Sequence, residues 1–512
     1  MNSVSPVSPI VLTTLNARYF HAALGLRYLL ANMGDLRPAT VLREFIITQP
    51  PLEIVESLLG HQPRIIGFGV YIWNVSETTQ VVALLKQIRP DIVIVLGGPE
   101  VSYEWETQPV AQLADHVLTG PADRAFGELS RRLLSGDKPA EKTIQAEPPA
   151  LRELVMPYRE YTEEDIAQRL IYVEASRGCP FRCEFCLSAL DKTAWPFDLD
   201  RFLDEMDILY QRGVRHFKFV DRTFNLKIDT SLRILEFFLD RLDERLFLHF
   251  ELIPDHLPER LKAAIRRFPA GALQFEIGIQ TFNPAVQALI SRKQDNAKTE
   301  ENLRWLRGQT QAHLHTDLIV GLPGEDMASF AVGFDRLVAL DPHEIQVGIL
   351  KRLRGAPIVR HDESHGIRYN PQPPYNILCS DWIDFADMQR LNRFARYWDL
   401  LGNAGRFQRG KTLLLGDEPF ARFMAFSDWL YATAGQTHQF ALERLFDWVY
   451  QGLTGPLAVA AAVAEDALSQ DYRASGARGC PHFMRPDTPS APQRKPAGHG
   501  ASRQARHVKT AV

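Results

Sequence analysis

The stretch IYVEASRGCPFRCEFCLS, residues 171–188, places three of the chain's five cysteines within eight residues, directly after an apolar, strand-like run. Cys179, Cys183 and Cys186 have the spacing Cys-x3-Cys-x2-Cys, and aromatic Phe185 stands just before the last of them. Three thiolates on one short loop suit three corners of a cubic 4Fe–4S cluster, whose usual complement is four cysteines. One iron then lacks a protein ligand, so the spacing predicts a reactive centre open to the amino and carboxylate groups of a small molecule.

Two other interpretations of the three cysteines are a zinc knuckle and a set of buried thiols. A structural zinc ion takes four ligands, commonly from paired Cys-x2-Cys or Cys/His motifs. The remaining cysteines, Cys379 and Cys480, are isolated and far along the chain. Cys379 is interpreted as a buried thiol or bystander, and Cys480 is not counted as a ligand.

Length and composition indicate a soluble protein of two to four domains. A net charge of −4 gives no reason to expect nucleic acid or an anionic membrane as partner. The first residues lack the basic and apolar regions of a secretory signal, and no apolar run is long enough to span a membrane. Because three of five cysteines are clustered, the composition favours a reducing, cytoplasmic location over a disulfide framework.

The first part of the chain alternates apolar strand-like runs with amphipathic segments, which predicts an α/β domain over residues 8–135. The expected architecture is a Rossmann-like, doubly wound parallel sheet, which binds ligands at the carboxyl ends of its strands. Gly97 and Gly98 follow one strand, where glycine allows a large flat ligand close to the backbone. Asn74 and Gly120 follow two other strands and are expected at the same edge. The alternative for Gly97-Gly98-Pro99 is a plain tight turn.

A linker over 136–168 precedes six strand-plus-helix units over 169–352, which predict a partial (β/α)6 barrel. Polar or glycine residues near the strand ends are expected at the chemical rim of this barrel. The candidates for cofactor contact are Asp221, Glu251, Gln280, Gly321 and Gly324. An acidic residue in an apolar strand needs a partner, so Glu251, and less strongly Glu276, either binds a cofactor or forms an ion pair with Lys218 or Arg222.

The last part of the chain is predicted to be a small helical domain over 353–470, closing the barrel mouth, and a disordered tail over 471–512. Tryptophans and phenylalanines at helical spacing indicate a core in the first of these segments. Proline, glycine, serine and arginine predominate in the second, which has few large apolar residues.

The cysteine loop resembles the cluster motif of the radical S-adenosylmethionine (SAM) superfamily, and the domain order resembles its cobalamin-binding type. VDRTFN, LKRLRGAP and PPYNIL further resemble an uncharacterised bacterial subgroup with a helical C-terminal domain. The resemblance implies a 4Fe–4S cluster, SAM and cobalamin as cofactors, and an electron donor such as flavodoxin or ferredoxin. It also implies that SAM is cleaved to a radical that abstracts hydrogen from an unactivated C–H bond of an organic substrate that the sequence does not name.

Two departures from the cobalamin-binding pattern keep alternatives open. The Asp-x-His-x-x-Gly element that supplies a cobalt ligand is absent, since Asp115-His116 lacks a glycine at the right distance. His21 and His61 are more simply ordinary polar residues. The acidic turn expected after the fifth strand is Gly120-Pro121-Ala122-Asp123. The alternatives are a radical SAM enzyme whose first domain has lost cobalamin, and a non-catalytic iron–sulfur module for redox sensing or binding.

Overall fold

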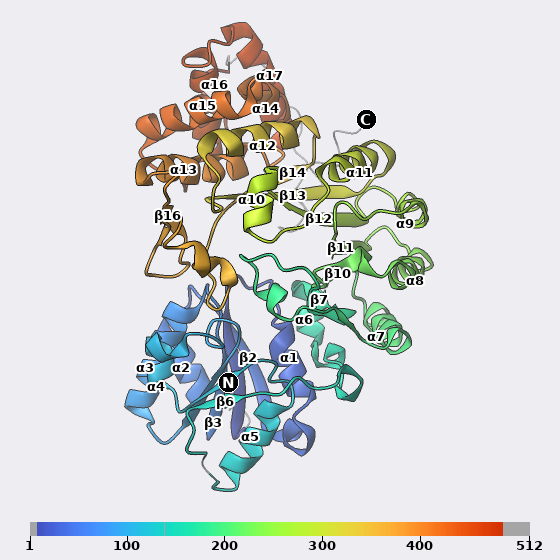
Figure 1. Cartoon of the computed structure of the whole chain (residues 1–512), viewed down its shortest axis with the longest axis vertical. Coiled ribbons are helices and arrows are strands. Elements are labelled where there is room, and N and C mark those ends of the chain that lie inside the picture. The colour runs from blue at the N-terminus through green and yellow to red at the C-terminus, as the bar shows by residue number, and fades with distance from the viewer. Residues whose placement is uncertain (1–7, 138, 485–512) are drawn as a thin grey trace.

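The computed structural model describes residues 8–137 and 139–484, which form three regions along the long axis of the molecule (Figure 1). The N-terminal region lies at one end, the barrel in the middle and a helical region at the other end. Within the described residues, no helix is both long enough and apolar enough to cross a membrane.

The N-terminal region is built on a six-stranded, entirely parallel sheet in the order β2-β1-β3-β4-β5-β6. Its strands are β1 (Ile10–Asn16), β2 (Thr40–Ile46), β3 (Ile65–Gly69), β4 (Val93–Gly97), β5 (His116–Thr119) and β6 (Thr143–Gln145). Alternate residues of β1 enter separate apolar cores, because a parallel sheet is covered on both faces. One face packs on α1 (Leu24–Ala31) and α5 (Ala125–Leu134), the other on α2 (Pro51–Leu59), α3 (Val75–Ile88) and α4 (Pro109–Leu113). This confirms the predicted doubly wound fold.

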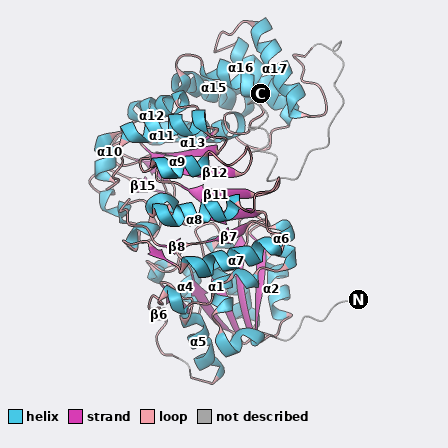
Figure 2. Cartoon of the chain, turned by 90° about the vertical axis from the view of Figure 1, so that its right-hand side faces the viewer, coloured by secondary structure: helices cyan, strands magenta, loops and turns pink. Residues whose placement is uncertain are grey.

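The middle region is a six-stranded parallel sheet whose strands follow one another in chain order, so it is a partial barrel. Its strands are β7 (Ile171–Val173), β10 (His216–Phe219), β11 (Phe247–Glu251), β12 (Leu273–Gln280), β13 (His313–Val320) and β14 (Glu344–Ile349). Helices cover the outer side of the strands, as Figure 2 shows for α7, α8 and α9. These outer helices are α7 (Leu199–Gln211), α8 (Ile228–Leu239), α9 (Glu259–Ile265), α10 (Pro284–Leu289), α11 (Asn296–Gln309) and α12 (Met327–Ala339). The predicted (β/α)6 barrel is confirmed.

The linker predicted over 136–168 needs a correction, because part of it belongs to the first sheet. β6 pairs with β5 in parallel, with Val117 opposite Thr143. Further on, α6 (Glu163–Gln168) begins with a capping box between Thr162 and Asp165. Asp165 also forms an ion pair with the buried Arg27 of α1, at 2.8 Å. Arg27 forms a second ion pair with Glu44, also at 2.8 Å. The connection is therefore packed into the N-terminal region.

The helical region packs on the β14 edge of the barrel. Trp398 of α13 donates an indole hydrogen bond to the Ile345 carbonyl at 2.8 Å. The helices share one apolar core with the barrel. They are α13 (Phe385–Leu401), α14 (Gln408–Leu415), α15 (Pro419–Ala434), α16 (Leu442–Thr454) and α17 (Ala461–Ser475). The helices therefore continue the apolar core of the barrel beyond β14.

The predicted start of the disordered tail, residue 471, lies inside α17, so that boundary was wrong. The description continues to residue 484, and residues 485–512 of the predicted tail lie outside the described residues.

Candidate active site and cofactor cavities

The three clustered cysteines lie on a loop that follows β7 and the short strand β8 (Ser176–Arg177). We call residues 179–186 the cluster loop. Its three thiols and the carboxyl ends of β11, β12 and β13 line one cavity of about 260 Å³, which we call the barrel cavity. All three thiols are free, and burial raises the pKa of Cys179 and Cys183.

The donor set of the barrel cavity fits a cluster held by three thiolates. Neither Cys379 nor Cys480 lines this cavity. In the described part of the chain, no three His, Cys, Asp or Glu side chains converge to hold a single metal ion. Each thiolate of an iron–sulfur cluster binds its own iron, so three thiols spread around one cavity match that arrangement. Phe185, which precedes Cys186, lines the same cavity.

Gln280 supplies a second sign that the barrel cavity binds a polar ligand. It ends β12 with a φ of 68°, next to a register shift between Gly278 and Gln280. Its side-chain oxygen is buried and has no hydrogen-bond partner among the described residues. Buried acceptors are normally satisfied, so this oxygen fits a ligand with hydroxyl or amino donors. SAM carries both kinds of group.

The two carboxyl groups of the third and fourth barrel strands have opposite protonation tendencies. Glu251 forms a 2.8 Å ion pair with Arg222, yet its burial raises the pKa to about 7. Burial alone would also raise the pKa of Glu276, but a 3.0 Å hydrogen bond with His249 and the charge of Lys218 lower it to about 2. Both residues line the barrel cavity, so near pH 7 the cavity combines a titrating carboxyl group with an ionised one.

A further charged group lies on the next two strands. The His315 ring lies 3.4 Å from Asp317 and 3.5 Å from Glu344. Burial alone would lower the pKa of His315, but these two carboxylates raise it to about 10. Asp317 lines the barrel cavity, so the lumen is polar and its charges are fixed in place, although the sequence suggested apolar strands.

Three predicted cofactor contacts do not line the barrel cavity. Asp221 accepts hydrogen bonds from the Ser176 hydroxyl at 2.6 Å and the Ala175 amide at 3.0 Å, and burial raises its pKa to about 7. A Cβ at Gly321 would lie 2.8 Å from Ile377, and one at Gly324 would lie 2.7 Å from Leu289. These residues therefore have hydrogen-bonding and close-packing roles in place of the predicted cavity positions.

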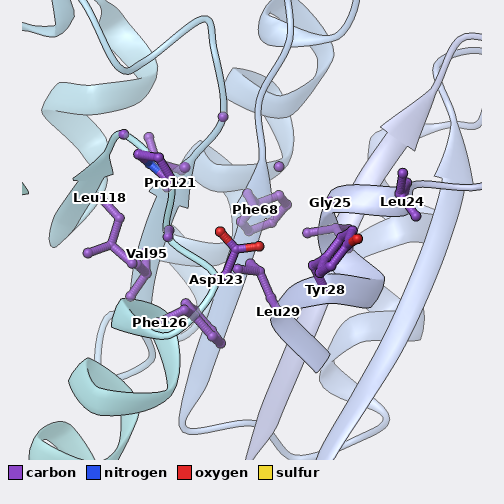
Figure 3. A pocket seen from close by; sticks show the side chains of 18 of the residues that line it. Leu24, Gly25, Tyr28, Leu29, Phe68, Val95, Leu118, Pro121, Asp123 and Phe126 are labelled. Carbon is purple, nitrogen blue, oxygen red and sulfur yellow. The ribbon is translucent and has the colours of Figure 1, made fainter. Parts of the chain in front are cut away.

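A second cavity, of about 320 Å³, lies in the N-terminal region between α1, α5 and the sheet. We call it the sheet cavity. Figure 3 shows Val95, Leu118 and Phe126 on one side of it and Leu24 with Tyr28 on the other. Its wall also contains six glycines, namely Gly25, Gly67, Gly69, Gly97, Gly98 and Gly120.

These glycines have different roles: Gly97 leaves the strand backbone open to the cavity, since a Cβ there would meet only the Leu118 carbonyl oxygen at 3.7 Å, whereas Gly98 allows the close approach of Val70. At Gly98, φ is +107° and a Cβ would lie 2.5 Å from the Val70 carbonyl oxygen, so only glycine fits there without strain. The apolar side walls and the glycine-lined strand ends suit a large, flat organic group. The cavity lining therefore fits a corrinoid.

The other predicted residues of this domain do not line the sheet cavity. The Asn74 amide is buried and donates to the Thr14 hydroxyl and to the Leu15 and Gly69 carbonyls, so it ties the strand ends together. His21 hydrogen-bonds the Tyr172 hydroxyl at 2.6 Å, and His61 bonds Arg43 at 2.8 Å. Neither histidine is a lining residue.

One short segment, the strand that leads into the cluster loop and the first cysteine after it, contributes residues to both cavities. Arg177 lines the sheet cavity two residues before Cys179, which lines the barrel cavity. Its guanidinium group pairs with Asp123 at 2.9 Å and with Glu174 at 2.8 Å. It also lies over the Tyr28 ring, 4.3 Å from the centroid. A single short segment therefore forms part of both walls.

Sequence reasoning missed Arg292 of the barrel cavity and Arg177 of the sheet cavity. Arg292 donates to the Cys183 sulfur at 3.5 Å, although it stands far along the chain in an irregular turn. Arg177 is only two residues from the first cysteine and Asp123 closes the Gly-Pro-Ala-Asp turn, so proximity to recognised motifs was the one available signal.

Comparison with protein-family models divides the chain in the same way. Residues 10–130 match the B12 binding domain, 173–335 the radical SAM superfamily, and 363–500 a family described as a protein of unknown function, DUF4080. The chain thus combines a region of the radical SAM superfamily with a preceding region that matches the B12 binding domain. This confirms the predicted cofactors, because radical SAM domains use a 4Fe–4S cluster with SAM and the first domain is of the B12-binding type.

Individual relatives are distant. The chain is similar to the cobalamin-dependent radical SAM methyltransferase TokK of Streptomyces tokunonensis, with 24% identity over 64% of this chain and 53% of TokK. It is also similar to the uncharacterised methyltransferase PH0819 of Pyrococcus horikoshii, with 26% identity over 42% of this chain and 53% of the relative. The chain therefore spans about half the length of these curated relatives. Among solved structures, the radical enzyme OxsB with aqua-cobalamin bound gives a TM-score of 0.59 at 13% identity, covering 91% of this chain and 84% of OxsB.

Proposed function

We propose that this protein is an enzyme that cleaves SAM reductively in the barrel cavity and directs the resulting radical at an unactivated C–H bond of an organic substrate. Methyl transfer with cobalamin is the favoured outcome. The observation that carries the proposal is that one segment, residues 174–179, contributes Glu174 and Arg177 to the glycine-lined sheet cavity and Cys179 to the three-thiol barrel cavity. When bound, the reduced cluster supplies the electron for SAM cleavage, and the corrinoid supplies a transferable methyl group.

In this proposal the chain's own residues bind the cluster and SAM, orient them and shield them from solvent. The thiolates of Cys179, Cys183 and Cys186 hold the cluster. Arg292, at hydrogen-bond distance from Cys183, offsets part of the negative charge that the thiolates bring into the cavity. Gln280 accepts a hydrogen bond from SAM.

Glu251 contributes in its protonated form as a donor and in its ionised form as an acceptor, since its pKa of about 7 leaves both forms populated at neutral pH. In the same proposal, an external one-electron donor, such as a flavodoxin or ferredoxin, reduces the cluster.

The test of the cluster compares three proteins after anaerobic reconstitution: the wild type, Cys179→Ala/Cys183→Ala/Cys186→Ala, and a matched control, Cys379→Ala/Cys480→Ala. We expect iron and sulfide at near-cluster stoichiometry, a reduced-cluster electron paramagnetic resonance signal, and 5′-deoxyadenosine with dithionite in the wild type and the control. The triple variant should lack all three. Equal near-zero iron in the wild type and the triple variant would refute the proposal.

Cobalamin use is tested separately by incubating the protein with hydroxocobalamin and measuring corrin absorbance after gel filtration. Retained absorbance supports methyl-transfer chemistry. Loss of the corrin together with continued SAM cleavage would favour a radical SAM enzyme that works without cobalamin. An iron-replete protein that forms no 5′-deoxyadenosine would favour a non-catalytic module.

A further inference from the structure

Glu184, inside the cluster loop, has a role that the cysteine motif does not explain. It lies between two predicted cluster ligands, Cys183 and Cys186, and only 4% of its side chain is exposed. Burying a carboxylate is costly unless it is paired and hydrogen-bonded. The contacts that satisfy Glu184 all come from distant parts of the chain.

Both carboxylate oxygens of Glu184 are used. Oε1 accepts from the Ser291 hydroxyl at 2.5 Å and pairs with Arg360 at 2.5 Å. Oε2 lies 2.9 Å from Nε2 of His361. The backbone is engaged as well, because the Glu184 amide donates to the Ile290 carbonyl at 3.1 Å and its carbonyl accepts from the Ile358 amide at 3.0 Å.

The Ser291 contact leads directly to the cluster ligands. Ser291 has a φ of 55°, and its neighbour Arg292 donates to the Cys183 sulfur at 3.5 Å. Glu184 therefore fixes the turn that presents Arg292 to this thiol. The cluster loop is therefore bound to the 291–292 turn by two contacts, one from the Glu184 carboxylate to Ser291 and one from Arg292 to Cys183.

The Arg360 and His361 contacts lead to the N-terminal region. We call residues 352–361 the bridging segment. At its other end, Arg354 pairs with the buried Glu100 at 3.0 Å, and Arg352 pairs with Glu104 at 2.8 Å. Glu100 lies two residues after Gly98, which lines the sheet cavity. The bridging segment is thus held by ion pairs at both ends, to the cluster loop at one end and to the N-terminal region at the other.

We propose that Glu184 is a positioning residue that fixes the cluster loop against the bridging segment and sets the charge beside the cluster. The inference rests on the proposed function, because it assumes that the cluster is bound. Exchanging the carboxylate for an amide adds one positive unit of charge near the cluster, which stabilises the more negative, reduced state. Removing the Arg360 guanidinium has the opposite sign.

The experiment measures iron content, midpoint potential and the electron paramagnetic resonance spectrum of the anaerobically reconstituted full chain. We expect a higher midpoint potential in Glu184→Gln and a lower one in Arg360→Gln, with the second shift smaller because 60% of the Arg360 side chain is exposed. The spectrum of Glu184→Gln should also change. Asp165→Asn is the matched control, since it breaks another buried ion-pair network, with Arg27 and Arg169, that includes no residue of the cluster loop, and it should alter stability but not potential.

Shifts of the same sign in Glu184→Gln and Arg360→Gln would overturn the proposal, and so would potentials equal to that of the wild type. If Glu184→Gln does not fold, Arg360→Gln alone decides, because a potential equal to or above that of the wild type contradicts the charge argument. An iron-free wild type would instead refute the proposed function. An iron-replete wild type with unaffected variants would refute only the role of Glu184.

Discussion

Two adjacent glycines of the sheet cavity should respond to substitution in opposite ways. Gly97 and Gly98 both line this cavity, but only Gly98 has a positive φ. A Cβ at Gly97 would lie 3.7 Å from its nearest neighbour, the Leu118 carbonyl oxygen, which is an ordinary contact. The same atom at Gly98 would lie 2.5 Å from the Val70 carbonyl oxygen.

The expected magnitudes follow from these contacts. Gly97→Ala should leave the free energy of unfolding unchanged or raise it by about 0.4–1 kcal/mol, because it restricts the unfolded chain. Gly98→Ala should lower it by about 2–6 kcal/mol, from roughly 1–3 kcal/mol of backbone strain and a similar overpacking term. Gly97→Leu should fill the cavity and abolish corrin binding while the protein stays folded.

The assay combines urea denaturation with corrin absorbance after gel filtration. Gly308→Leu is the matched control, because Gly308 lies on α11 with no heavy atom within 4 Å of its Cβ position. Undiminished corrin binding by Gly97→Leu would refute the assignment of the cavity to cobalamin. A Gly98→Ala protein as stable as the wild type would refute the argument from backbone conformation.

Three further predictions concern buried polar groups. Burial raises the pKa of Glu325 to about 7, so the folded protein holds a proton that the unfolded chain has released; this group's contribution to stability therefore falls as pH rises from about 4.5 to 7. Glu325→Gln should remove that dependence when unfolding at pH 5 and pH 8 is compared, and an unaltered pH dependence would contradict it. Arg177→Met leaves the carboxylates of Asp123 and Glu174 unpaired and should cost about 3–5 kcal/mol in urea denaturation, so a cost below 1 kcal/mol would argue against a buried network. Asn74→Ala loses three buried hydrogen bonds and should cost about 2–4 kcal/mol, whereas intact stability with lost corrin binding would restore Asn74 as a ligand contact.

Local sequence patterns were sufficient for the fold and for the centre of the site. Most strands of the first sheet are continuous apolar runs, the longer barrel strands alternate apolar with polar residues, and the cysteine triplet is recognisable without any neighbour. Gly97, Gly98 and Gly120 were found because glycine at the end of a parallel strand has a direct physical meaning.

The remaining features depend on contacts between distant residues, which leave no periodic signal. Glu184 meets Arg360 and His361 more than 170 positions away. β6 has only three residues, too few for an alternating pattern to stand out. Gly321 resembled a cofactor turn, but its lack of a side chain accommodates Ile377, a residue of the segment after the barrel.

The strand β6 has a practical consequence for dividing the protein into transplantable modules. Cutting the chain after residue 135 would remove this strand and leave β5 as an unpaired edge strand, which promotes aggregation. The same cut would remove Asp165, one of the two anionic partners of the desolvated Arg27. A fragment meant to fold by itself should therefore run through α6, beyond the end of the match to the B12 binding domain at residue 130.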